Sequence, residues 1–270
     1  MRTILVTNDD GVDSPTLMPL ARALERLGRV TVIAPTTERS WIGKAVTRFD
    51  VVHAHTVERD GRSVQAVSGT PADCVNLGVH ALSSAPPDLV VSGINLGLNF
   101  GLAFLLSSGT IGAAIEAWIC GVPSLAFSMA IPDDAYGLTG VHRIAALGKR
   151  PEAAAAVAAE IVETILNEGF PSAVDSFTVN MPADVNLDTT RVVASVTRCR
   201  YGPLFQPGPE GGYLHRFSSL TAIEERADGD MQVVQRGAVA ICPLRFDFEV
   251  SLPDGLRIAL ESRPASTRRG

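Results

Sequence analysis

The fold is decided by a short apolar run that ends in two acids: residues 3–11 read Thr-Ile-Leu-Val-Thr-Asn-Asp-Asp-Gly. A continuous run of this kind, without alternating polar residues, is typical of a strand buried on both faces of a parallel sheet. Leucines at helical spacing follow over 17–27, and a second apolar run covers 30–34. This strand–helix–strand order predicts a parallel sheet flanked by helices.

The same alternation continues further along the chain. Residues 88–92 and 124–128 read as buried strands, with a helix of small residues over 110–120 between them. Residues 46–67 are rich in valine and contain the turn signal Asp60-Gly61, so we expect an antiparallel excursion there. The expected fold class is α/β, with a Rossmann-like doubly wound sheet.

The character of the chain changes near residue 170. Residues 1–170 carry the alternating strands and helices and end with a long Ala-rich helix over 151–167. Residues 171–270 read as shorter strands around a Pro- and Gly-rich loop or hairpin arm at 201–212. We expect both parts to belong to one domain, with the candidate site in the first part.

Composition excludes several classes of function. The chain has 23 Lys and Arg against 29 Asp and Glu, a net charge of −6, so it lacks the cationic excess that a nucleic-acid duplex requires. We expect no membrane span, because no apolar run reaches about eighteen residues. The 4 cysteines form no C-x-x-C pair and are predicted to be buried thiols. With no signal-peptide core before the first acids, we expect a cytoplasmic protein.

Two adjacent acids, Asp9 and Asp10, follow the first predicted strand directly. Ligands of open α/β sheets bind outside the carboxyl ends of the strands, and Mg²⁺ or Mn²⁺ prefers carboxylate and other oxygen ligands. The alternative is a solvated Asp-Asp-Gly turn, which is a common turn signal. The motif alone supports the two interpretations about equally, and its position at a strand end favours a metal.

Three further loops carry polar groups that could complete such a site. Residues 92–99 offer the amide of Asn95, residues 39–44 offer the hydroxyl of Ser40, and residues 107–110 begin a helix whose N–H groups favour an anion. Each has a plainer interpretation: an amide that satisfies its own loop, a surface loop, and an ordinary N-cap. Together, at neighbouring strand ends, they suit metal-assisted phosphoryl transfer.

Several motifs stand in the order and spacing of one known family. They are Asn8–Gly11, Ala34-Pro35 followed by Arg39-Ser40, Ser68–Val75, Ser92–Asn95 and Ser108–Thr110. This combination resembles the SurE proteins, the stationary-phase survival 5′-nucleotidases. The resemblance is close over residues 1–130 and becomes weaker over 170–250.

The resemblance implies a Rossmann-like core with a protruding β-hairpin, in a homodimer or homotetramer whose C-terminal elements are exchanged between subunits. It implies a phosphomonoesterase that uses a divalent cation, Mg²⁺ or Mn²⁺, and acts on nucleoside 5′-monophosphates, with 3′-monophosphates and short polyphosphate as further substrates. The site residues that it implies are metal ligands at Asp9, Asp10, Ser40 and Asn95, of which the two aspartates are catalytic, and phosphate-binding residues at Asn8, Ser108, Gly109 and Thr110.

Two segments depart from the family pattern. Trp41 follows Ser40 where family members usually have glycine, and Lys44 stands where asparagine is common. Trp41 either narrows the site or stacks on a base, or else packs on the surface or at a subunit interface. The segment 101–110 is one residue longer than usual and lacks the family's acids. Its apolar run, residues 102–106, is either buried at an interface or an exposed patch with a binding role, and we favour the interface.

Two other functions remain as alternatives. A diverged relative could bind nucleotides, or act as a scaffold, without catalysis. A dehydrogenase is disfavoured because no G-x-G-x-x-G follows the first strand. For the hydrolase, water is the ultimate nucleophile, and the sequence leaves open whether Asp9 acts as a general base or attacks phosphorus itself.

Overall fold

The computed structural model describes residues 1–224, 226–247 and 249–262. Within these residues the central sheet has nine strands: β1 (Thr3–Thr7), β2 (Arg29–Pro35), β3 (Ala54–Arg59), β4 (Arg62–Val67), β5 (Leu89–Leu96), β6 (Ser124–Met129), β7 (Ser176–Met181), β8 (Arg191–Val193) and β13 (Val239–Leu244). Their order is β3-β4-β2-β1-β5-β6-β7-β13-β8, and the strands from β4 to β7 are parallel.

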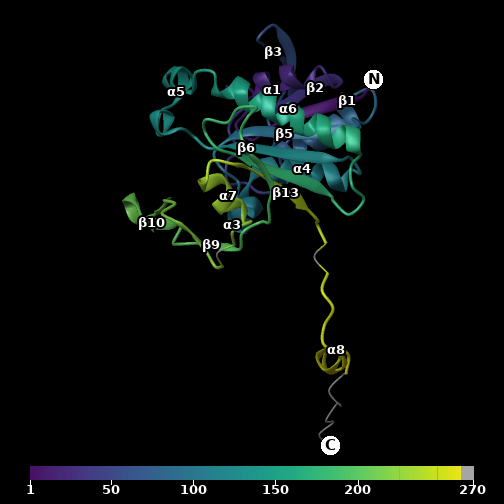
Figure 1. The fold of residues 1–270 in the computed structure, drawn as a ribbon, viewed down its shortest axis with the longest axis vertical. Coiled ribbons are helices and arrows are strands. Elements are labelled where there is room, and N and C mark those ends of the chain that lie inside the picture. The colour runs from purple at the N-terminus through teal and green to yellow at the C-terminus, as the bar shows by residue number, and fades with distance from the viewer. Residues whose placement is uncertain (225, 248, 263–270) are drawn as a thin grey trace, which may run out of the picture.

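Helices pack on both faces of this sheet (Figure 1). The helices are α1 (Leu17–Leu24), α2 (Pro71–Leu77), α3 (Gly101–Ser107), α4 (Gly109–Ile119), α5 (Gly140–Leu147), α6 (Arg150–Glu168), α7 (Asp230–Gln235) and α8 (Asp254–Glu261), with short π or 3₁₀ turns at Gly78–Leu82, Asp133–Ala135 and Pro209–Gly211. Along β1, Ile4 and Val6 join the core under α1 and α6, whereas Leu5 joins the core under α2 and α4. Burial on both faces explains the continuous apolar run, and the predicted α/β fold is confirmed.

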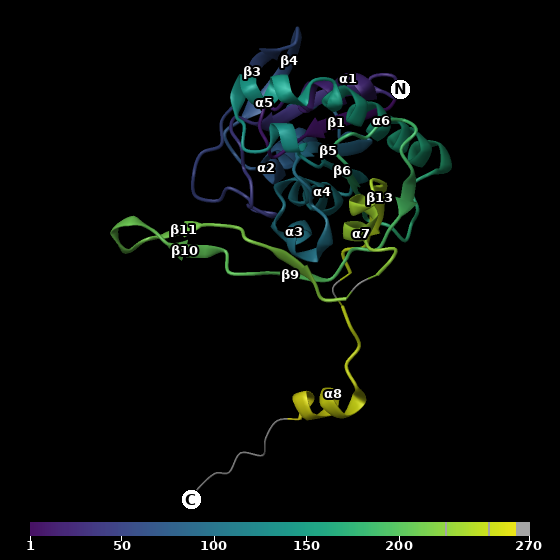
Figure 2. The same ribbon diagram turned by 60° about the vertical axis from the view of Figure 1, so that its left-hand side comes forward.

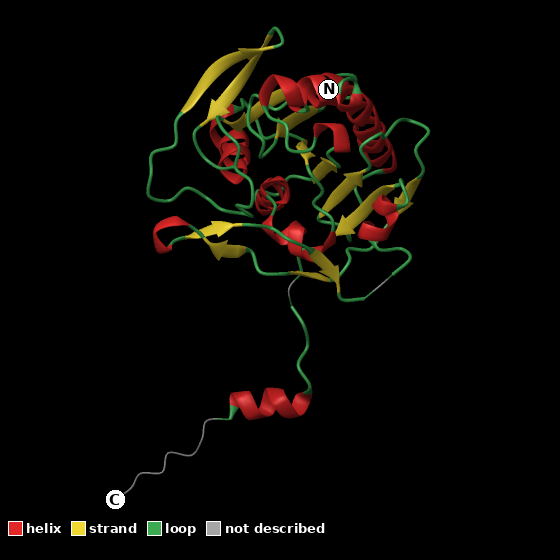
Figure 3. Ribbon diagram, turned by 90° about the vertical axis from the view of Figure 1, so that its left-hand side faces the viewer, coloured by secondary structure: helices red, strands yellow, loops and turns green. Residues whose placement is uncertain are grey.

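The chain adds strands first on one side of β1 and then, from β5 onward, on its other side. From β1 the chain runs outward to β2 and the β3–β4 hairpin, and it then returns to place β5 on the other side of β1. The hairpin turns at Asp60-Gly61, as the sequence predicts, and projects from the body (Figure 3). Loops at the carboxyl ends of β1, β2 and β5 therefore meet at one edge of the sheet.

An arm leaves the body between β8 and α7. It consists of β9 (Cys199–Tyr201) paired antiparallel with β12 (Leu220–Ala222), and β10 (Phe205–Pro207) paired with β11 (Tyr213–His215) at its tip (Figure 2). The two ends of the arm lie together, because Ser195 and Gly229 form a β-bridge. The buried carboxylate of Asp230 accepts the Thr197 N–H at 3.0 Å and the Gly101 N–H at 2.8 Å.

The C-terminal helix α8 stands apart from the body, and none of its residues is buried (Figure 1). Exchange of this element between subunits stays a prediction, as does the division of the chain at residue 170. Residues 263–270 of the predicted C-terminal part lie outside the described residues. In the part of the chain that the structure describes, no single helix is long and apolar enough to cross a membrane, although α3 and α4 would pass this test together, with a 70° bend between them.

Candidate active site

A cavity of about 340 Å³ opens where the loops after β1, β2 and β5 meet the start of α4. All four segments contribute polar residues to its lining, among them Asp9, Ser40, Asn95, Asn99 and Ser108. Its volume lies at the lower end of the range of pockets that bind small molecules. The four loops that the sequence indicated therefore contribute side chains to one cavity.

Asp9 lies at the buried end of this cavity and is only 4% exposed. One of its oxygens, Oδ1, accepts a hydrogen bond from Thr110 Oγ1 at 2.6 Å. Burial raises the pKa of Asp9 from 3.8 to about 6, against the opposing effect of the Thr110 hydrogen bond. The backbone carbonyl of Asp9 also accepts the Arg39 N–H at 2.7 Å, which ties the Ser40 loop to the end of β1.

Asp10 faces a neighbouring cavity of about 160 Å³, lined also by Glu38 and Arg143. Its carboxylate accepts the Leu96 N–H at 3.0 Å. Burial, followed by the negative charge of Asp9, raises the pKa of Asp10 well above its ordinary value. The negative charge of Asp9 thus opposes the ionisation of Asp10, and a divalent cation beside the two carboxylates would relieve this repulsion.

Ser40 and Asn95 supply neutral oxygen atoms to the same cavity as Asp9. Ser40 Oγ donates to Glu38 Oε1 at 2.6 Å, and Asn95 Nδ2 donates to the Gly97 carbonyl at 2.6 Å. The second bond fixes the orientation of the Asn95 amide at the end of β5. Among the described residues, no group of three or more His, Cys, Asp and Glu side chains forms a metal site. A cation here would therefore rely on mixed carboxylate, hydroxyl and amide oxygens, the ligand types that Mg²⁺ and Mn²⁺ accept.

Asn8 holds the acidic turn in shape. Its side chain is fully buried, its Nδ2 donates to the Gly11 carbonyl at 3.0 Å, and its Oδ1 accepts the Gly11 N–H at 3.1 Å. Asn8 is not among the residues that line the cavity. Its role in phosphate binding stays a prediction, while its position in the turn explains how Asp9 and Asp10 are held.

The start of α4 packs directly against Asp9. Ser108 is the N-cap, and its Oγ accepts the Ile111 N–H at 3.2 Å. A Cβ atom on Gly109 would lie 2.8 Å from Asp9 Cβ and 3.0 Å from Asp9 Oδ2, so only glycine allows this approach. Thr110 is fully buried, and of the three predicted phosphate-binding residues in this segment Ser108 alone lines the cavity.

Asn99 is a cavity residue that the sequence did not single out. It is buried, its Nδ2 donates to Ser128 Oγ at 2.8 Å and to Thr110 Oγ1 at 3.4 Å, and its own N–H donates to Asn180 Oδ1 at 2.8 Å. Asn99 thus links the helix start to β6 and β7. It stands in the motif over 92–99, but only the spatial neighbours distinguish it from other loop amides.

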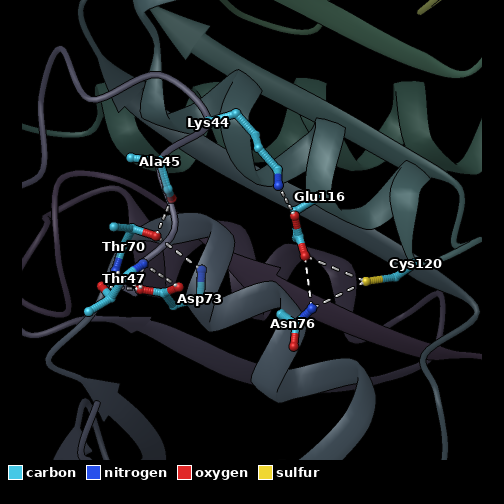
Figure 4. Close-up of polar contacts among 8 residues, drawn as sticks. All are labelled: Lys44, Ala45, Thr47, Thr70, Asp73, Asn76, Glu116 and Cys120. Atoms are coloured by element: carbon cyan, nitrogen blue, oxygen red, sulfur yellow. Dashed lines mark hydrogen bonds and ion pairs between the residues drawn. The ribbon is translucent and has the colours of Figure 1, made fainter. Parts of the chain in front are cut away.

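The loop that carries Ser40 is fastened to α2 and α4 (Figure 4). Lys44 Nζ lies 2.6 Å from the buried Glu116 carboxylate, which also accepts Asn76 Nδ2 at 2.8 Å. Further along, Thr47 Oγ1 donates to Asp73 Oδ2 at 2.6 Å. Lys44 therefore forms an ion pair that anchors the loop.

Substitution of Gly112 by alanine tests this anchoring. A Cβ atom at Gly112 would overlap the Gly43 carbonyl and lie 2.9 Å from Lys44 Cα, so the loop must move away from α4. A displacement of about 1 Å in a catalytic group commonly lowers turnover by about 100-fold, so we expect Gly112→Ala to lower the activity of this site by about 10- to 100-fold. Gly255→Ala, a helical glycine with open space around it, is the matched control. Unchanged turnover in Gly112→Ala would contradict the anchoring role.

The fold and the site define a class: a doubly wound α/β protein in which an acidic pair and a helix start meet at the edge of a parallel sheet. Comparison with known families makes the class more specific. The family model described as "Survival protein SurE" matches residues 4–202. The chain belongs to the SurE family, as the motifs of its first half predicted.

Relatives and a solved structure agree with this assignment. The chain is 35% identical over 259 residues to "5′-nucleotidase SurE" of Methanothrix thermoacetophila, a match that spans 94% of this chain and 97% of that protein. It is 38% identical over 251 residues to "5′-nucleotidase SurE" of Geobacter sulfurreducens, over 91% and 88% of the two chains. The crystal structure of the SurE protein from Aquifex aeolicus superposes with a TM-score of 0.73 at 31% identity, over 92% of this chain and 94% of that one.

Proposed function

We propose that this protein is a 5′-nucleotidase, a phosphomonoesterase that converts nucleoside 5′-monophosphates to nucleoside and phosphate. The observation that carries the proposal is the close approach of the start of α4 to the buried carboxylate of Asp9, at the wall of a cavity of about 340 Å³. The relatives that bear the name 5′-nucleotidase span nearly the whole chain, which supports the same activity.

The residues around Asp9 fit a divalent cation, and we propose Asp9, Asp10, Ser40 and Asn95 as its ligands, with Mg²⁺ or Mn²⁺ as the ion. Support comes from the donor chemistry, because two carboxylates, a hydroxyl and an amide oxygen match a hard cation. Support also comes from the raised pKa values of Asp9 and Asp10, since such a pair favours a nearby positive charge. When bound, the cation would polarise the phosphate and neutralise its charge.

The protein's own groups would orient the phosphate and supply the reactive oxygen. Ser108 and the first N–H groups of α4 lie at the positive end of the helix dipole and favour the phosphate anion. Thr110 holds Asp9 through its hydroxyl, and Asn99 holds Thr110 in turn. Both roles open to Asp9, proton acceptor from water or nucleophile toward phosphorus, require its ionised carboxylate, so activity should fall in acid as Asp9 is protonated.

The proposal extends to partners and location. We propose a homodimer or homotetramer with exchanged C-terminal elements, supported by the exposed apolar residues of α8, which include Leu256, Ile258 and Leu260. The net charge of −6 supports a small-molecule substrate rather than a nucleic-acid duplex, and we propose no membrane partner. The four free cysteines support a reducing compartment, the cytoplasm.

Phosphate release from a panel of nucleoside monophosphates tests this proposal. We expect release in the presence of Mn²⁺ or Mg²⁺, loss of release on addition of EDTA, and recovery when the cation is restored. The panel should include 5′- and 3′-monophosphates of each base, together with a short polyphosphate. If folded protein releases no phosphate with either cation, the chain is a nucleotide-binding relative without catalysis.

A further inference from the structure

The cavity has two chemically different parts. Four of its polar residues, Asp9, Asn95, Asn99 and Ser108, are buried, whereas the aromatic residues Trp41 and Tyr136 are exposed and Phe104 is half-buried. Trp41 is 42% exposed and Tyr136 is 76% exposed. A ligand with its phosphate beside Asp9 would therefore place the rest of its structure against an aromatic wall.

Trp41 is held in this wall by contacts with four other aromatic rings. It follows Ser40 directly, so its Cα lies about 3.8 Å from that of a proposed metal ligand. Its ring centroid lies 5.6 Å from that of Phe104, at 90°, in the edge-to-face geometry that aromatic pairs prefer. From the arm, His215 at 4.8 Å and Phe217 at 6.0 Å pack against the same indole. These contacts hold the ring beside the cavity before any ligand arrives.

The backbone at Trp41 adds an independent observation. Its φ is +59°, in the left-handed region where a residue with a Cβ is disfavoured and glycine is not. A large aromatic residue at such a position, next to a cavity, indicates that the side chain has a function that offsets the strain.

We propose that Trp41, supported by Phe104, is the surface on which the nucleotide base stacks, so that this enzyme selects phosphomonoesters by their aromatic base. The inference rests on the proposed function and specifies which part of the substrate the cavity recognises. Stacking suits every base, because each has a π-face, and it is worth most where the aromatic side chain is already held in place. A sugar phosphate without a base would leave the aromatic wall uncovered.

Two substrates that differ only in the base provide the kinetic test. We compare kcat/KM for AMP and for ribose 5-phosphate in the wild type and in Trp41→Leu, which keeps an apolar side chain but removes the π-face. We expect Trp41→Leu to lower kcat/KM for AMP by about 10-fold or more and for ribose 5-phosphate by less than about 2-fold. Trp41→Phe should recover most of the loss. Equal losses for both substrates would overturn the proposal, because they would indicate a packing role only.

Phe205→Leu is the matched control, since Phe205 lies in the same arm and packs against His215 at a centroid distance of 5.7 Å, but is neither one of the rings around Trp41 nor a residue that lines the cavity. We expect the ratio of kcat/KM for AMP to kcat/KM for ribose 5-phosphate to be the same in this variant as in the wild type. A ratio shifted as far as in Trp41→Leu would mean that the arm contact, and not the stacking face, sets the preference, which would overturn the proposal.

Fluorescence tests stacking without catalysis. The chain has 2 tryptophans, and Trp118 lies on α4 against Phe246, at a centroid distance of 5.3 Å. In a Trp118→Phe background the emission therefore reports on Trp41 alone. We expect saturable quenching by adenosine and none by ribose. Hydrolysis of AMP without adenosine quenching would overturn the stacking inference and leave the proposed function intact, whereas quenching without hydrolysis would overturn the function and leave the stacking site.

Discussion

Asp9→Asn should lower turnover of AMP at saturating Mn²⁺ by at least about 1,000-fold while the protein remains folded, because an amide can neither accept a proton from water nor attack phosphorus. Asparagine keeps the shape of the side chain and can still accept the Thr110 hydroxyl, which Asp9 accepts at 2.6 Å. Steady-state kinetics and circular dichroism on the same sample provide the measurement. Asp13→Asn is the matched control, since Asp13 lies in the same loop but is exposed and pairs with Arg59. Turnover within about 10-fold of the wild type would remove Asp9 from the chemistry.

The stability of the same variant should change in the opposite direction when no cation is present. Because burial raises the pKa of Asp9 to about 6, the folded metal-free protein loses stability as the pH rises from below 4 through 6 and the carboxylate ionises. The rise from 3.8 corresponds to about 3 kcal/mol as an upper value, so Asp9→Asn should unfold at higher denaturant than the wild type at pH 7.5 and equally at pH 4. Mn²⁺ should stabilise the wild type and not the variant. A variant with this pattern has lost only the buried charge, because a damaged fold would be less stable than the wild type at both pH values.

Gly109→Ala should lower turnover by at least about 100-fold, the second-largest effect that the geometry predicts. The added Cβ would lie 2.8 Å from Asp9 Cβ and 3.1 Å from the Arg39 carbonyl, so either the helix start or Asp9 must shift. Such a shift separates the proposed phosphate-binding segment from the proposed metal ligand. Kinetics with AMP, together with Mn²⁺ stabilisation as a readout of metal binding, measure both consequences.

The control for Gly109→Ala is again Gly255→Ala, a helical position with nothing within 4 Å of the added atom. Stabilisation by Mn²⁺ that survives in Gly109→Ala would show that the phosphate segment alone has moved. Turnover within about 3-fold of the wild type would contradict the close approach of α4 to Asp9.

The strands that position the site could be predicted because they leave local signals. Residues 4–6, 32–34 and 89–91 are continuous apolar runs, and burial on both faces of a parallel sheet requires such runs. The turn at Asp60-Gly61 was equally local. The family motifs then identified the loops at the strand ends, and these loops meet at the cavity.

What the sequence could not predict depends on contacts between distant residues. The burial of Thr110 behind Asp9 joins residues 101 positions apart, and no local pattern reports it. The sequence left open whether Trp41 lies in the site or packs on the surface. In the structure its side chain lines the cavity next to Phe104 and also packs against His215 of the arm. The apolar run 102–106 lies in α3 with Leu105 buried and Leu106 exposed, and its place at an interface stays a prediction.

The closure of the arm at its base has a consequence for how this architecture can diversify. The chain enters and leaves the arm through the bridge between Ser195 and Gly229, and Asp230 fastens both the entry, at Thr197, and the helix α3, at Gly101. The structure of the central sheet and of the acidic turn therefore does not depend on the length of the arm between Ser195 and Gly229. Insertions and deletions can accumulate in the arm at little cost to the body, so that members of one lineage can keep the same chemistry and acquire new specificities through a replaceable module.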